Sequence, residues 1–112
     1  MFTGIVTGLG RVTEHQPIGD GQRITVACGD WPIDDIAIGD SIMHSGCCLT
    51  IVEKAAGVLR SDVTAHSLSL VTGLSVGSLV NLEKSLTLAD KLGGHLVTGH
   101  VDAAGLVTQW KN

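Results

Sequence analysis

The stretch Arg23-Ile24-Thr25-Val26-Ala27-Cys28 alternates along the chain with the two-residue period of a half-buried β-strand. Ile24, Val26 and Cys28 share one face of this strand, and we expect that face to point into a core. Comparable runs occupy residues 49–53, 58–63 and 79–83, and glycine-containing turns separate them. No segment keeps a helical period over several turns. The pattern therefore predicts an all-β protein.

About six short strands joined by Gly-rich turns favour a small antiparallel barrel, a fold that leaves few free strand edges. Two segments are expected to form single helical turns. Residues 32–37 begin with a proline and carry two acids in the first turn, while in residues 64–70 Thr64 is placed to cap the helix. The 112 residues suffice for one core, and an aromatic content of 3% requires that core to be aliphatic.

Charge and hydropathy exclude several classes of function. A net charge of −4 without a basic cluster argues against a nucleic-acid partner. No apolar run approaches the roughly 18 residues that span a bilayer, and no secretory signal is visible, so no membrane partner is expected. Three cysteines, two of them adjacent, do not form a disulfide framework. A reducing cytoplasm is the simplest location.

The first strand motif recurs near the end of the chain. The Thr-Gly pair at residues 3–4, a valine, a later glycine and a Val-Thr pair all return 95 residues further on, from Thr98. A repeat at domain length suggests duplication of a whole barrel rather than a solenoid. Glycine, valine and threonine are abundant here, however. On spacing alone, duplication and chance recurrence are equally supported.

Metal and dinucleotide sites are not expected. Cys47 and Cys48 would point to opposite faces of a strand, and the odd spacing of His95 and His100 divides those histidines in the same way. The Gly-x-Gly at residues 8–10 has no third glycine and no long helix after it, so it lacks the dinucleotide fingerprint.

Two side chains are candidates for chemistry. Cys47 shares a strand face with apolar neighbours and is interpreted as a core residue, whereas Cys48 shares the other face with Thr50 and is able to line a polar pocket. From the pattern alone, Cys48 is equally well a second packed cysteine. His100 stands where the first copy of the repeat has Ile5, so it marks either a pocket or a strand exposed on that side.

Four motifs in the same order resemble riboflavin synthase, the alpha chain. They are Met-Phe-Thr-Gly-Ile-Val at residues 1–6, Gly-Cys-Cys-Leu-Thr at 46–50, Val-Gly at 76–77 leading into Val-Asn-Leu-Glu at 80–83, and Leu-Gly-Gly-His-Leu-Val-Thr-Gly-His-Val-Asp at 92–102. The resemblance is spread over nearly all of the chain, and its last motif is the most specific.

The resemblance implies an all-β, six-stranded antiparallel Greek-key barrel, here with one or two short helical turns. Members of this family carry two such barrels in tandem and a C-terminal helix that drives trimerisation. They dismutate two molecules of 6,7-dimethyl-8-ribityllumazine by four-carbon transfer, which yields riboflavin and a ribitylamino-pyrimidinedione without metal or organic cofactor. Each active site lies between the N-terminal barrel of one subunit and the C-terminal barrel of another.

On this basis residues 1–97 are expected to form the first lumazine-binding barrel, and residues 98–112 the start of a second repeat whose remainder is absent. The chain is then the N-terminal half of the enzyme, binding lumazine or riboflavin and weakly active or inactive by itself. We expect a homodimer for the isolated domain and a homotrimer for a full-length protein.

The resemblance also places substrate contacts and chemistry. Thr50 and strand backbone suit the pyrimidine edge, while Asp62 and the residues after it suit ribityl hydroxyls. Cys48 and His100 are the expected catalytic residues, for nucleophilic assistance and proton transfer. The expected substrate-binding residues are Gly4, Ile5, Val6, Cys48, Leu49, Thr50, Asp62, Val63, Thr64, Ala65, His66, Ser67, Gly99, His100 and Val101.

Three departures from the family pattern bear on these expectations. Family members commonly carry an acid at the position of His66, residues 70–75 form a shorter stretch than usual, and the C-terminal barrel is missing. Two other functions remain open. One is a non-enzymatic lumazine or flavin carrier, which would have no need of Cys48 and His100. The other is an unrelated β-barrel interaction module.

Overall fold

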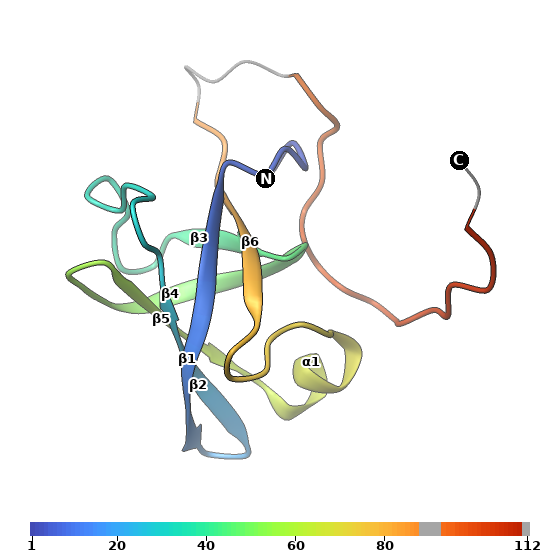
Figure 1. Cartoon of the computed structure of the whole chain (residues 1–112), viewed down its shortest axis with the longest axis horizontal. Coiled ribbons are helices and arrows are strands. Elements are labelled where there is room, and N and C mark those ends of the chain that lie inside the picture. The colour runs from blue at the N-terminus through green and yellow to red at the C-terminus, as the bar shows by residue number, and fades with distance from the viewer. Residues whose placement is uncertain (88–92, 111–112) are drawn as a thin grey trace.

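The computed structural model describes residues 1–87 and 93–110 and shows six antiparallel strands closed into a barrel in the order β1-β2-β5-β4-β3-β6 (Figure 1). Strands β3, β4 and β5 form a meander, and β6 returns to pair with β3, which is a Greek-key arrangement. The predicted all-β Greek-key barrel is confirmed. Its elements are β1 (Gly8–Ile18), β2 (Gly21–Ala27), β3 (Ser41–His44), β4 (Cys47–Ala55), β5 (Val58–Val63), α1 (Ala65–Leu70) and β6 (Leu79–Lys84).

One of the two predicted helical turns forms. Thr64 caps α1, because its hydroxyl accepts a hydrogen bond from the Ser67 amide at 3.1 Å. The prediction for residues 32–37 is wrong, since these residues make only a turn, closed by the Ile36 amide on the Ile33 carbonyl at 3.0 Å. The reason is the Lys54 ammonium, which donates to the carbonyls of Ile33, Asp34 and Ile36. Because this side chain of β4 already donates hydrogen bonds to the carbonyls, they do not need the backbone amides of a helix as donors.

The core lies inside the barrel and is built by the two-residue alternation of the strands. Ile24, Val26 and Cys28 are buried, as the sequence predicts. Along β4 the inward face is Cys47, Leu49 and Ile51, whereas Cys48, Thr50 and Val52 lie on the outer, partly exposed face. Burial raises the pKa of the Cys47 thiol, so this cysteine is a protonated core residue.

Both ends of the chain lie outside the barrel wall. Phe2 is fully buried and forms an isolated antiparallel bridge with Val97. Beyond residue 100 the described chain has no helix or strand, and it runs away from the barrel (Figure 1). Within the described ranges, no helix has the length and apolar content needed to cross a membrane.

The barrel also encloses a histidine. His44 of β3 is 1% exposed, and its Nδ1–H donates to the Ile42 carbonyl at 3.0 Å. Burial lowers the pKa of this imidazole from 6.5 to about 4, because the charged ring would lose its hydration. The ring therefore remains neutral in the folded protein at neutral pH.

Acid is expected to destabilise the fold through His44. The unfolded chain protonates the ring near pH 6.5 and the folded chain near pH 4, so stability is lost as the pH falls between these values. The full effect is about 3 kcal/mol, at roughly 1.4 kcal/mol per pKa unit. Urea unfolding from pH 7 to pH 4 measures it. A His44→Asn variant keeps a donor for the Ile42 carbonyl and should have a shallower slope in this window; an equal slope would contradict the assignment.

Candidate functional site

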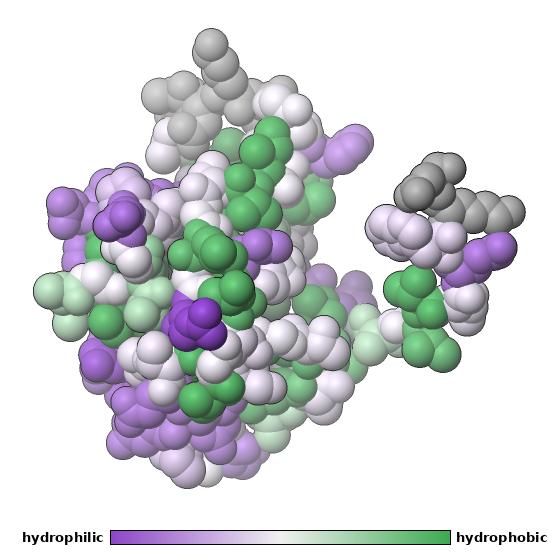
Figure 2. Space-filling view, in the orientation of Figure 1, coloured by the Kyte–Doolittle hydropathy of each residue, from purple (hydrophilic) through white to green (hydrophobic). Residues whose placement is uncertain are grey.

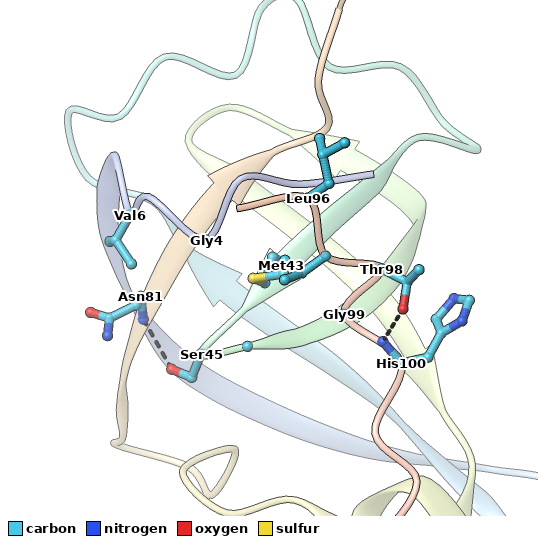
Figure 3. A pocket seen from close by; sticks show the side chains of 11 residues that line it. Gly4, Val6, Met43, Ser45, Asn81, Leu96, Thr98, Gly99 and His100 are labelled. Atoms are coloured by element: carbon cyan, nitrogen blue, oxygen red, sulfur yellow. Dashed lines mark hydrogen bonds between the residues drawn. The ribbon is translucent and has the colours of Figure 1, made fainter. Parts of the chain in front are cut away.

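An open cavity of about 720 Å³ lies against the outside of the barrel, where the N-terminal segment and residues 96–100 pass over β3 and β6 (Figure 3). Its walls combine aliphatic side chains with a few polar groups. The lining residues are Gly4, Val6, Met43, Ser45, Gly46, Asn81, Leu96, Val97, Thr98, Gly99 and His100.

A buried carboxylate fixes the N-terminal wall. Glu83 of β6 is 5% exposed and accepts hydrogen bonds from the Thr3 amide at 2.8 Å, the Thr3 hydroxyl at 3.1 Å and the Gly4 amide at 3.1 Å. The Thr3 hydroxyl in turn accepts from the Ile5 amide at 3.2 Å. Gly4 adopts φ +85°, a conformation that favours glycine. These bonds place Gly4 and Val6 on the cavity.

Residues 96–100, which we call the crossing segment, form the opposite wall. Phe2 and Val97 exchange two backbone hydrogen bonds of 2.8 Å, and the Gly99 carbonyl accepts from the Cys48 amide at 2.8 Å. Gly99 has φ +77°, and a Cβ there would lie 2.9 Å from Cβ of Cys48. A side chain at position 99 would therefore separate the crossing segment from β4.

The floor of the cavity is the turn between β3 and β4. Ser45 and Gly46 have φ values of +47° and +88°, as expected for a two-residue type I′ hairpin. Ser45 is the only non-glycine with positive φ among the described residues, and two bonds to Asn81 hold it. Its amide donates to the Asn81 carbonyl at 2.7 Å, and its hydroxyl accepts from the Asn81 amide at 3.0 Å. Met43 closes the floor with its thioether.

The two expected catalytic residues lie on neighbouring segments that are joined through their backbone. Cys48 is half-buried on the outer face of β4 and is bonded through its amide to Gly99, the residue before His100. The His100 amide donates to the Thr98 hydroxyl at 3.3 Å, which orients this part of the segment. His100 is exposed, and its imidazole points away from Met43 and Ser45 (Figure 3).

Asp62 lies elsewhere on the outer face and already has partners. Arg23 holds its carboxylate with two bonds of 2.7 and 3.1 Å and also reaches Glu53 at 3.0 Å. The hydrogen bond from Arg23 lowers the pKa of Asp62. Ile51 of β4 pairs with Ser61 of β5 in antiparallel fashion. Thr50 precedes Ile51 and Asp62 follows Ser61, so the two residues lie toward the same end of the barrel. Both are exposed on the outer face.

The end of β5 and the segment after it contribute less to the cavity than the sequence suggests. Val63 is buried, and the Thr64 hydroxyl is occupied in capping α1. Ala65 and His66 are exposed in the first turn of this helix. None of these residues lines the cavity.

The structure thus divides the expected substrate-binding residues into two groups. Gly4, Val6, Gly99 and His100 line the cavity, with Cys48 directly behind Gly99. The segments 49–50 and 62–67 lie outside its lining, and Ile5 and Val101 are exposed beside it. In residues 1–87 and 93–110, no three His, Cys, Asp or Glu side chains converge as a metal site would require.

Sequence reasoning missed most of the floor and part of the crossing segment. These residues are Met43, Ser45, Gly46, Asn81, Leu96, Val97 and Thr98. Ser-Gly between two strand-like runs was a usable signal for the hairpin turn. Nothing local marks Met43 or Asn81, because their role depends on the pairing of β3 with β6.

Comparison with known proteins identifies relatives of this chain. The family model described as the lumazine binding domain matches residues 3–85. The riboflavin synthase of Mycobacterium tuberculosis is 44% identical over 108 residues, which cover 94% of this chain and 53% of the relative. That of Photobacterium phosphoreum is 37% identical over 111 residues, covering 97% and 51%. The chain spans about half the length of the curated relatives it matches.

Solved structures agree with this likeness. A crystal structure of LumP complexed with riboflavin superposes with a TM-score of 0.76 at 29% identity, covering 92% of this chain and 56% of that one. A structure of LumP complexed with 6,7-dimethyl-8-(1'-D-ribityl) lumazine gives a TM-score of 0.75 at 29% identity, with coverage of 92% and 58%.

Removing the charge of Glu83 should loosen the N-terminal wall. In a Glu83→Gln variant the amide nitrogen cannot accept, so one of the buried Thr3 and Gly4 donors loses its partner at a cost of about 1–3 kcal/mol. Urea unfolding measures this loss, and hydrogen exchange at the Thr3 and Gly4 amides should accelerate. The exposed Glu14 offers a matched control, because Glu14→Gln should shift stability by less than about 0.5 kcal/mol. Equal effects of the two substitutions would contradict the anchoring role.

Proposed function

The chain belongs to the lumazine-binding domain family, and we propose that it binds 6,7-dimethyl-8-ribityllumazine and riboflavin in the cavity between its N-terminal and crossing segments. The observation that carries this proposal is the cavity itself, with the family's Thr-Gly motifs on two of its walls. Its volume of about 720 Å³ lies within the ordinary range for small-molecule sites.

The chemistry of the walls suits a flat heterocycle with polar edges. Val6, Met43 and Leu96 offer apolar surface for the rings. Ser45, Asn81 and Thr98 offer hydroxyl and amide groups for carbonyl and ring nitrogen atoms. Ribityl hydroxyls would extend toward the exposed outer face, where Thr50 and Asp62 lie. Asp62 would then contact a ligand only through a carboxylate that Arg23 already orients.

We further propose that this chain acts as the N-terminal half of a riboflavin synthase. The support is its coverage, since relatives named riboflavin synthase match it along almost its whole length and are about twice as long. In the proposed reaction, one lumazine loses a proton from its acidic 7-methyl group, and the other accepts attack at ring carbon 7. A second barrel would hold the second lumazine, and fixed orientation of the pair would supply much of the rate.

Cys48 and His100 are the proposed catalytic residues of this half. Their proximity through Gly99 supports a shared role beside one ring system. The exposed imidazole of His100 suits proton transfer, and the half-buried thiol of Cys48 suits addition to an electrophilic ring carbon. With one barrel alone we expect binding with slow or no turnover, in a reducing compartment that keeps the thiol free.

A non-enzymatic carrier is the second candidate function. The likeness to LumP favours it, because LumP has been solved with riboflavin, with the ribityl lumazine and with flavin mononucleotide. A carrier and a half-enzyme need the same cavity. They differ only in what happens to the bound lumazine.

A titration with 6,7-dimethyl-8-ribityllumazine distinguishes these functions. We expect saturable changes in ligand fluorescence, together with trace riboflavin formation or none, measured by chromatography. If neither lumazine nor riboflavin binds to the protein, both candidate functions are contradicted. If riboflavin forms, a Cys48→Ser variant that binds and reacts unchanged would remove the thiol from the proposed chemistry.

A charge introduced on the apolar wall tests whether the ligand binds in this cavity. Val6 is 50% exposed, so Val6→Asp should leave stability nearly unchanged but weaken lumazine binding about tenfold or more, because the ring would desolvate a carboxylate. Ile38, which is 68% exposed and outside the cavity lining, provides the matched Ile38→Asp control. Isothermal titration of both variants gives the comparison. Equal affinities would place the ligand elsewhere.

A further inference from the structure

The N-terminal wall of the cavity is fixed on both sides of Val6. Ahead of Val6, the Glu83 carboxylate binds the amides of residues 3–4. Directly after it, the hydroxyl of Thr7 accepts a hydrogen bond from the indole Nε1–H of Trp31 at 3.2 Å. Trp31 comes from the connection between β2 and β3 and lies outside the cavity lining. A residue outside the site therefore contacts one of its walls.

Val6 depends on its neighbours along the chain, because the core does not hold it. Ile5 and Val6 are about half exposed, and apolar colour gathers on the face that carries the N-terminal segment (Figure 2). A side chain that stays in water gains little from the hydrophobic effect, so packing does not fix its place. The position of Val6 is therefore set by the backbone on either side of it, and Thr7 is one of those two sides.

The indole ring of Trp31 packs directly on the first residue of β1. A Cβ at Gly8 would lie 2.4 Å from Cδ1 of the ring, which is closer than side chains approach one another. The glycines with positive φ in the described chain do not include Gly8. Glycine is therefore needed at this position for space, because another group comes close to the strand there. The ring and the start of β1 fit each other without a gap.

A lysine of β6 holds the ring in this place. The ammonium of Lys84 lies over the ring of Trp31, 5.0 Å from its centroid, and the attraction between a cation and an aromatic face stabilises this arrangement. The same ammonium binds the carboxylate of Asp35 at 2.7 Å, which fixes its position. Glu83 and Lys84 are consecutive residues of β6. This strand therefore fixes both sides of Val6, with Glu83 acting directly and Lys84 acting through Trp31.

We propose that Trp31 is a positioning residue of the ligand site. Its Nε1–H holds Thr7, and Thr7 sets where Val6 presents apolar surface to a bound ring. The inference rests on the proposed function, because it takes Val6 to cover a lumazine or flavin ring. Trp31 does not touch the ligand. It favours binding because a wall that is ordered beforehand loses less conformational freedom when the ligand arrives.

The first test needs no ligand. Trp31→Phe keeps an aromatic ring beside Gly8 but has no N–H to donate. In nuclear magnetic resonance measurements on this variant, the order parameters of the Val6 methyl groups should fall, and the Thr7 amide should exchange with solvent faster. The methyl groups of Val76, which is exposed in the loop before β6, serve as the control and should not respond. Unchanged Val6 order together with unchanged Thr7 exchange overturns the proposal.

The second test measures the Kd of 6,7-dimethyl-8-ribityllumazine by isothermal titration, at a temperature where every variant is folded. Trp31→Phe and Thr7→Val each remove one partner of the same hydrogen bond, so each should raise Kd about threefold. The double variant should raise it no further, because the bond is already lost in either single variant. Thr7→Ser keeps the hydroxyl and should restore binding to within about twofold. Trp110→Phe, at an exposed tryptophan outside the cavity lining, is the matched control and should bind unchanged.

The outcomes separate this inference from the proposed function. If the unmodified chain binds neither lumazine nor riboflavin, the proposed function fails, whereas the first test still decides whether Trp31 holds the wall. If the unmodified chain binds and both single variants bind equally well, only the role of Trp31 is overturned. The same holds if the effects of the two substitutions multiply in the double variant. A lower melting temperature of Trp31→Phe with an unchanged Kd would leave Trp31 a role in stability alone, which also overturns the proposal.

Discussion

Strand β6 closes the barrel, because it pairs with β1 on one side and with β3 on the other. Its inward residues Val80 and Leu82 are fully buried, so the strand also completes the core. Glu83 follows directly and carries the carboxylate that receives the N-terminal turn. Closure of the barrel and placement of the cavity wall therefore depend on the same six residues. Without β6, neither the hairpin at Ser45 nor the segment at Gly4 has its partner.

The candidate site is made of backbone as much as of side chains. Its walls are two irregular segments that run outside the barrel, and each is held by hydrogen bonds to the strands beneath it. Such segments cannot continue a sheet, because the glycines at 4 and 99 have positive φ. As a result, apolar side chains and polar groups face the same cavity. A rigid barrel with irregular segments over it is a common way to build a binding site.

The charged groups outside the cavity form ion pairs between strands of the barrel. Arg23 joins Asp62 of β5 to Glu53 of β4, and Arg60 reaches Glu53 as well. These pairs are partly exposed, so each adds little stability by itself. Their effect is to fix which way the outer side chains of three neighbouring strands point. A polar ligand that reaches this face would meet oriented groups rather than mobile ones.

The sequence by itself determined the strand alternation, the aliphatic core, the cap at Thr64 and the family, because each depends on neighbours within a few residues or on motifs read in order. Through that resemblance it also marked Gly4, Val6, Gly99 and His100, which line the cavity, as candidate site residues. It could not show that Met43 and Asn81 line one cavity, that Lys54 donates to the carbonyls of Ile33, Asp34 and Ile36, or that Glu83 receives Thr3. Those contacts join residues far apart in the chain, and only closure of the barrel decided them.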